Sequence, residues 1–136
     1  MSAQMHDKIL YDGTEYLLAA TPLEGYFDSH PERRPKFHGF NTACMRGYVA
    51  KWTVRDGRLY LVDVEMLIPT DATYASIFPD AAADGVFADW VSGDFKCPHG
   101  AMLRSVHAGF DSVWERELHM SFQNGLLTSV EDRRNT

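Results

Sequence analysis

The chain of 136 residues is long enough to form one hydrophobic core and too short to form two. Hydrophobic residues make up 45% and charged residues 24% of it, a composition that excludes a disordered chain. The net charge of −6 disfavours nucleic acids and anionic membranes as partners, because it repels their phosphates. We therefore expect a single domain over residues 1–136, with residues 1–6 and 132–136 frayed.

The compartment is predicted to be the cytoplasm. No apolar run approaches the roughly 18–20 residues of a membrane span, and residues 1–8 are polar, without the apolar region of a signal peptide. Thiols stay reduced in the cytosol, so Cys44 and Cys97 are not expected to form a disulfide. We also predict no cofactor, because a chain of this size folds without a metal or a disulfide.

Asx-Gly dipeptides mark the turns of the chain. Asp12-Gly13, Asp56-Gly57 and Asn124-Gly125 each lie between two extended, β-prone runs. Both central residues of a type I′ turn need positive φ, which suits Asx-Gly. The sequence therefore predicts three hairpins, in which residues 8–11 pair with 14–18, 48–55 with 58–64, and 114–123 with 126–130.

The central hairpin has a predicted register, because a two-residue turn places Arg55 opposite Arg58. Counting outward places Trp52 opposite Leu61 on the core face. The full set of expected pairs is Arg55–Arg58, Val54–Leu59, Thr53–Tyr60, Trp52–Leu61, Lys51–Val62 and Val49–Val64.

Helix is expected to be scarce. Residues 22–29 are expected to form a single turn, and residues 31–36, which are locally basic, are interpreted as a solvated loop. A short helix capped by Thr70 or Asp71 is predicted to end near Phe78, with one more turn over residues 80–84.

A fourth strand pair completes the predicted fold. Residues 86–97 read as extended, Pro98-His99-Gly100 as a turn, and residues 101–107 as the return strand. The predicted fold class is mainly β, with about eight antiparallel strands in hairpins and one or two short helices. Such a meander closes into a barrel or folds over as a sandwich, and the sequence leaves both open.

No catalytic motif is present, which favours a protein that is not an enzyme without excluding one. Thiolate and imidazole are good zinc ligands, so Cys44, Cys97, His99 and His107 are weak metal candidates, although their spacing matches no common zinc pattern. A cysteine beside a histidine is also the arrangement of a nucleophile. The plainer interpretation is a buried Cys97 and a turn histidine.

Polar residues in two other places are candidates for binding. Glu115, Glu117 and His119 share one face of a predicted strand, where they are either solvated or contact a basic partner. Asp63 and Asp89 interrupt apolar runs, and a buried aspartate needs a partner. We expect that partner to be Arg46 or Arg104.

Four segments of the chain carry a resemblance to a known family: residues 41–48 (Asn-Thr-Ala-Cys-Met-Arg-Gly-Tyr), 56–61, 87–90 and 113–117. Together they resemble a family of small uncharacterised bacterial proteins that carry a Thr-Ala-Cys-x-Arg-Gly-Tyr segment, over residues 10–127. The variable position, often Trp in that family, is Met45 here. The resemblance implies a bacterial, cytosolic, single-domain protein and no particular activity.

Three functions follow from these observations. The first is a non-enzymatic, acidic protein-interaction module of the immunity, inhibitor or regulatory kind, with another protein as its partner. The second is a β-barrel that holds a small molecule in an interior cavity lined by aromatic residues, with Asp63 or Arg46 pointing inward. The third is an enzyme with a Cys/His or metal site. The residues expected to take part in binding are Arg46, Asp89, Trp90, Glu115, Glu117 and His119.

Overall fold

A computed structural model of the chain describes residues 4–79, 81, 84–104, 110 and 112–134. The strands are β1 (Asp7–Tyr11), β2 (Thr14–Leu18), β3 (Tyr48–Arg55), β4 (Arg58–Met66), β5 (Val86–Phe87), β6 (Gly93–Arg104), β7 (Val113–Gln123) and β8 (Leu126–Arg134). The helices are α1 (Pro22–Ser29), the 3-10 turn η1 (Pro31–Arg33) and α2 (Tyr74–Ile77). The predicted fold class, mainly β with about eight strands and short helices, is confirmed.

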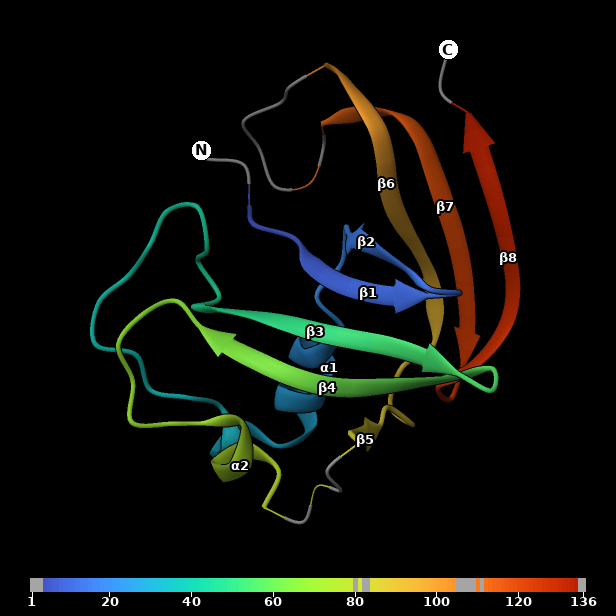
Figure 1. The fold of residues 1–136 in the computed structure, drawn as a ribbon. Helices are drawn as coiled ribbons and strands as arrows, with labels where there is room; N and C mark the ends of the chain where they lie inside the picture. The colour runs from blue at the N-terminus through green and yellow to red at the C-terminus, as the bar shows by residue number, and fades with distance from the viewer. Residues whose placement is uncertain (1–3, 80, 82–83, 105–109, 111, 135–136) are drawn as a thin grey trace.

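All eight strands belong to one sheet in the order β2-β1-β3-β4-β8-β7-β6, with β5 paired to β4. In Figure 1, β1, β3 and β4 run across the view, while β6, β7 and β8 cross it in a different direction. We call β1–β5 the first half of the sheet and β6–β8 the second half. The two halves meet where the turn of the β3–β4 hairpin contacts the turn of the β7–β8 hairpin. There, Leu59 N–H donates to Gly125 O at 2.8 Å and Leu127 N–H to Gly57 O at 2.7 Å.

The sheet is not closed, so the expectation of a closed β-barrel is wrong. Among the described strands, β2 and β6 are the two ends of the order, and no ladder joins them. Near these ends, Ala19 N–H, just after β2, donates to Lys96 O on β6 at 2.9 Å. The meander is also interrupted, because β1 pairs with β3 in parallel. A parallel pair needs a long crossover, which residues 19–47 supply.

The three predicted turns are confirmed. Both central residues of Asp12-Gly13, Asp56-Gly57 and Asn124-Gly125 have positive φ, as type I′ turns require. The hairpins that they connect match the predicted ranges to within two residues at each end, except that β8 continues past residue 130 to Arg134. Residues 132–134, expected to be frayed, are therefore the end of a strand.

The predicted register of the central hairpin is correct only as far as Trp52, which lies opposite Leu61. A bulge between Lys51 and Trp52 then shifts the pairing, so that Lys51 lies opposite Asp63. A bulge adds one residue to one strand and reverses which side its later residues face. Because of this shift, both Leu61 and Val64 reach the core.

Pro98-His99-Gly100 is not a turn, contrary to the sequence prediction. β6 runs through all three residues, with Pro98 opposite Glu117 and His99 opposite Arg116 on β7. An edge strand tolerates a proline because one of its sides needs no ladder hydrogen bond. Gly100, with a φ of 79°, lies in a bulge between His99 and Met102. His107, at the end of the predicted return strand, lies outside the described residues.

The helices also differ from the predicted ones. α1 has eight residues rather than a single turn. α2 begins later than expected, because Thr73 rather than Thr70 or Asp71 forms a capping box with Ser76. The predicted turn over residues 80–84 falls largely outside the described residues. In the part of the chain that the structure describes, no helix is long and apolar enough to cross a membrane.

The core lies between the curved sheet and α1, which is seen behind β3 and β4 in Figure 1. α1 contributes Leu23, Tyr26 and Phe27 to it. Both halves of the sheet contribute as well, for example through Trp52 on β3 and Met120 on β7. One core thus holds the two halves of an open sheet together.

We predict that Gly125→Ala destabilises the protein more than Gly13→Ala does. Both glycines have nearly equal φ angles, 80° and 78°, so the backbone strain of either alanine is about 1 kcal/mol. A Cβ at position 125 would also lie 2.5 Å from Ala88 O, whereas nothing lies within 4 Å of one at position 13. Overpacking of this kind adds about 1–3 kcal/mol. Urea unfolding followed by tryptophan fluorescence measures the difference, and equal losses would contradict the close contact between the two halves.

Candidate functional site

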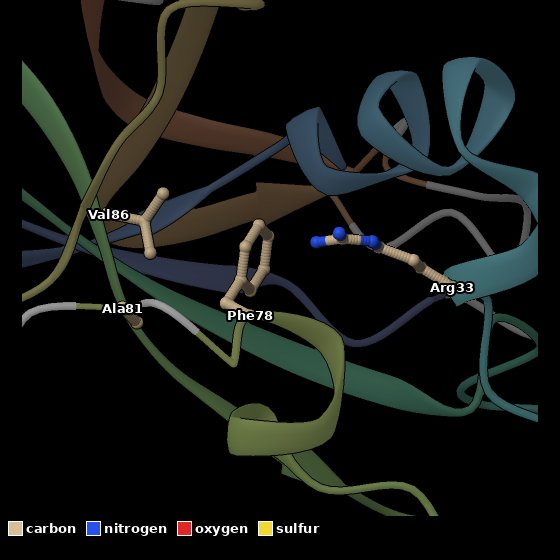
Figure 2. A pocket seen from close by; sticks show the side chains of 4 residues that line it. All are labelled: Arg33, Phe78, Ala81 and Val86. Atoms are coloured by element: carbon tan, nitrogen blue, oxygen red, sulfur yellow. The ribbon is translucent and has the colours of Figure 1, made fainter.

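A small pocket lies between η1, α2 and β5 and has a volume of about 150 Å³. It is lined by Arg33, Phe78, Ala81 and Val86 (Figure 2). The Arg33 Nη1 donates to the hydroxyl of Tyr26 at 2.9 Å and to Ile77 O at 3.1 Å. Neither Asp63 nor Arg46, which the sequence suggested as inward-pointing groups of a ligand cavity, is among the lining residues.

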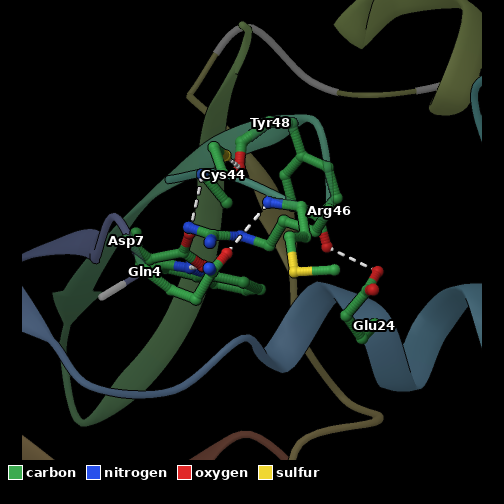
Figure 3. A network of polar contacts seen from close by, with 9 residues as sticks. Gln4, Asp7, Glu24, Cys44, Arg46 and Tyr48 are labelled. Atoms are coloured by element: carbon green, nitrogen blue, oxygen red, sulfur yellow. Dashed lines mark hydrogen bonds and ion pairs between the residues drawn. The ribbon is translucent and has the colours of Figure 1, made fainter. Parts of the chain in front are cut away.

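A buried ion pair joins β1 to the segment before β3 (Figure 3). The Arg46 Nη2 lies 2.7 Å from Asp7 Oδ1, and the two residues are 8% and 0% exposed. The same carboxylate accepts hydrogen bonds from Ala50 N–H at 3.0 Å and from Trp52 Nε1 at 3.1 Å. Burial raises the pKa of Asp7, while Arg46 and these hydrogen bonds act in the opposite direction.

The sequence therefore predicted the correct arginine and the wrong aspartates. Asp63 and Asp89 are both exposed, and the buried partner of Arg46 is Asp7. A pattern in the sequence indicates this position, because Asp7 and Ile9 alternate along β1 and therefore face the same side. Arg46, expected to bind a partner, is instead enclosed, with its guanidinium 5.5 Å from the centre of the Tyr48 ring.

Residues 38–47, which we call the pinned loop, follow a fixed path above this ion pair. The side chain of Gln4 donates to Thr42 O at 2.8 Å and accepts from Met45 N–H at 2.9 Å. Met5 N–H donates to Ala43 O at 2.7 Å. Residues 4–6, predicted to be frayed, therefore include two residues that hold the loop in place.

The inner side of the pinned loop is packed against the protein. Cys44 is fully buried, and its thiol donates to Tyr48 O at 3.2 Å. Gly47 has a φ of 85°, and a Cβ there would overlap the ring of Phe37 at 2.6 Å. Only a glycine therefore allows the loop to turn into β3 over Phe37.

The outer side of the pinned loop is apolar and faces solvent. Phe40 is 84% exposed and Met45 is 74% exposed, the two highest values among the large hydrophobic residues that the structure describes. Both side chains lie on one loop, and the hydrogen bonds of Gln4 hold the backbone of Met45 in place, which makes them candidates for a contact surface. Sequence reasoning missed both as binding residues and noted Met45 only as a departure from the family pattern.

A second polar chain joins the loop region to α1. The Tyr48 hydroxyl donates to Glu24 Oε2 at 2.7 Å, and Glu24 also accepts two hydrogen bonds from Arg34 at 2.8 and 2.9 Å. Burial, followed by the negative charge of Glu24, raises the pKa of Tyr48. Tyr48 thus stays protonated and links β3 to α1.

The weak metal candidates do not meet. The described residues contain no group of three or more His, Cys, Asp or Glu side chains that suits a metal ion. The Cys97 thiol lies 3.9 Å from the Met120 sulfur, and His99 Nε2 lies 3.1 Å from Asp132 Oδ1. His107 is outside the described residues.

On the predicted acidic face of β7, the charge of Glu117 is balanced by Lys96 of the neighbouring strand β6. Glu117 lies 3.4 Å from Lys96 Nζ and 4.0 Å from His119 Nε2. Glu115 lies beside the backbone of Gly100. Cross-strand pairing with Lys96 weakens the case for this face as a site for a basic partner.

Asp89 and Trp90, the remaining predicted binding residues, differ in their environments. Asp89 is exposed. The indole N–H of Trp90 donates to Pro22 O at 2.9 Å, and its ring stacks on Phe78 with an interplanar angle of 15°. Trp90 therefore holds α1 against the core, which is a structural role.

A polar cluster on the inner side of β6, β7 and β8 was not predicted. Asp132 accepts from Arg116 at 3.0 Å and pairs with His99, whose ring meets Tyr16 edge-on at 5.5 Å between centroids. Residues from three strands and from β2 meet here, and no sequence pattern connects them.

Comparison with known proteins identifies no family, relative or fold neighbour for the chain. No protein-family model, no curated protein and no solved structure matches the chain. The resemblance to the Thr-Ala-Cys-x-Arg-Gly-Tyr family stays a prediction.

We predict that Arg46→Met destabilises the protein by about 3–5 kcal/mol, because it leaves the buried Asp7 carboxylate without its cation. Removal of the Arg46 charge raises the pKa of Asp7 further, because that charge lowers it in the original protein. A carboxyl whose pKa is higher in the folded state than in the unfolded state contributes stability that is lost as pH rises through the folded pKa. The deficit of the variant relative to the original protein should therefore grow as the pH rises from about 4, the unfolded pKa of an aspartate, toward neutral. A deficit that shrinks over this range in urea unfolding would contradict this account.

We also predict that neither thiol reacts in the folded protein. Both cysteines are fully buried, and burial raises the pKa of Cys97 to about 12, so little thiolate forms near neutral pH. A chromogenic disulfide reagent at about pH 8 should be consumed only as fast as the protein unfolds, with both thiols reacting in urea. One rapid equivalent without urea would restore the Cys/His nucleophile as a candidate.

Proposed function

We propose that this chain is a non-enzymatic protein-interaction module that binds another protein through the pinned loop. The observation that carries the proposal is the exposure of Phe40 and Met45, 84% and 74%, on a loop fixed by hydrogen bonds. The partner surface that fits is an apolar pocket able to receive both side chains.

The energetics support such a contact. Full burial of a Phe or Met side chain contributes about 1.5–3 kcal/mol. When a mobile loop binds, part of this favourable free energy is offset by the entropy lost in ordering the loop. The pinned loop is already ordered by Gln4, Met5 and the buried Cys44, so less is lost on binding. Large apolar anchors at the centre of an interface are typical hot spots.

The charge of the chain supports a basic rim on the partner. A net charge of −6 attracts a cationic surface and accelerates encounter with it. An acidic domain with a rigid apolar contact suits an immunity, inhibitor or regulatory protein. We place this contact in a bacterial cytoplasm, in line with the family resemblance and with two free buried cysteines.

We expect the double variant Phe40→Ser/Met45→Ser to lose the partner while keeping its fold. Tagged protein is captured gently from its own cells and weighed by native mass spectrometry, and the partner so identified is purified for titration. Removing two apolar anchors should weaken its binding by at least about 100-fold. Urea unfolding should show a change within about 0.5 kcal/mol, as for other exposed positions.

The matched control is Leu10→Ser/Val130→Ser, which removes two exposed apolar side chains from β1 and β8. This variant should keep the affinity of the original protein. The proposal fails if the captured protein is a bare monomer, or if the control loses the partner and the loop variant retains it. A doubled mass that survives the loop variant would also count against it.

A further inference from the structure

The pocket between η1, α2 and β5 has apolar walls and one cationic group. Phe78, Ala81 and Val86 supply the apolar side, and Figure 2 shows the guanidinium of Arg33 reaching toward the ring of Phe78. A pocket with apolar walls and a single well-placed polar group is the usual form of a small-molecule site.

Arg33 differs from its neighbour Arg34 in having no carboxylate partner among the described residues. Arg34 holds Glu24 through two hydrogen bonds of 2.8 and 2.9 Å. Arg33 uses only Nη1, for Tyr26 and Ile77 O, and within the described residues its Nε and Nη2 make no hydrogen bond. This edge of a guanidinium is a planar fork that matches a carboxylate.

The pocket is already formed. The two hydrogen bonds of Nη1 hold the Arg33 guanidinium in place. The Phe78 ring packs against Tyr26 at 4.7 Å and stacks on Trp90 at 6.2 Å between centroids. A ligand would therefore lose little free energy in ordering these side chains.

We propose that this pocket binds a small aromatic carboxylate. Its volume of about 150 Å³ has room for one aromatic ring, which would stay partly in contact with water because the pocket is open to solvent and Arg33 is exposed. The ring would lie against Phe78 and Val86, and the carboxylate would accept from Nε and Nη2 of Arg33. The pocket shares no residue with the pinned loop, so a negative result in the ligand test would not count against the proposed protein contact.

The test is a titration of the ¹⁵N-labelled full chain with benzoate, followed by NMR. Benzoate should saturably shift the backbone amides of Phe78, Ala81 and Val86 and the Nε–H of Arg33. Benzyl alcohol, with the same ring and no charge, should bind at least about tenfold more weakly, because it cannot form the charged pair. Acetate, with the charge and no ring, should cause no saturable shift at the same concentration.

Two variants and one control complete the test. Arg33→Gln should weaken benzoate binding at least about tenfold, and Ala81→Leu, which fills the pocket, should abolish it while retaining Arg33. Arg133→Gln, which removes an equal charge from β8, should bind like the original protein. If Arg33→Gln does not fold, the binding of benzoate by Ala81→Leu serves as the test of the pocket. The proposal is overturned if benzoate causes no saturable shift in the pocket, if benzyl alcohol binds equally well, or if Ala81→Leu still binds benzoate.

Discussion

The buried pair of Asp7 and Arg46 is the interaction on which the arrangement of the N-terminal half depends. Its carboxylate accepts from an arginine that precedes β3 and from a backbone amide and an indole within β3. β1 is thereby held beside β3 in parallel, a pairing that no short turn enforces. A buried ion pair contributes little net stability compared with apolar side chains of the same shape, but breaking it is costly. We therefore interpret it as a device that selects one register and one path for the chain.

The path selected in this way leaves the large apolar side chain of Met45 in water. Arg46 and Cys44 are buried, whereas Met45 between them is 74% exposed. Gln4 and Met5, which precede Asp7, then bond the outer backbone of the same loop. Met45 is thus exposed between two buried neighbours, without any motif that a sequence search would detect.

Local features of the fold were predictable from sequence, and pairings between distant segments were not. Positive φ at Asp12-Gly13, Asp56-Gly57 and Asn124-Gly125 depends on the turn residues themselves, so the hairpins and most of their register followed. The bulge at Trp52 and the contact of Gly125 with Ala88 depend on strands from elsewhere in the chain. Pro98-His99-Gly100 was misread for the same reason, because only the position of β6 at the sheet edge makes a proline acceptable there.

Both candidate sites draw on the long connection between α1 and β3, which contains the whole pinned loop and contributes Arg33 to the pocket, and this is a further reason why the sequence did not predict them. Residues 31–36 were interpreted as a solvated loop, yet Arg33 faces a pocket and Arg34 is tied to α1 through Glu24. Farther along, the N–H of His38, the first residue of the pinned loop, donates to Pro69 O at 2.7 Å. Loops held by a rigid sheet are where proteins place binding residues, because side chains there can change without disturbing the core. The hairpins of this chain, predictable because they are regular, form the support, and the irregular connection carries the chemistry.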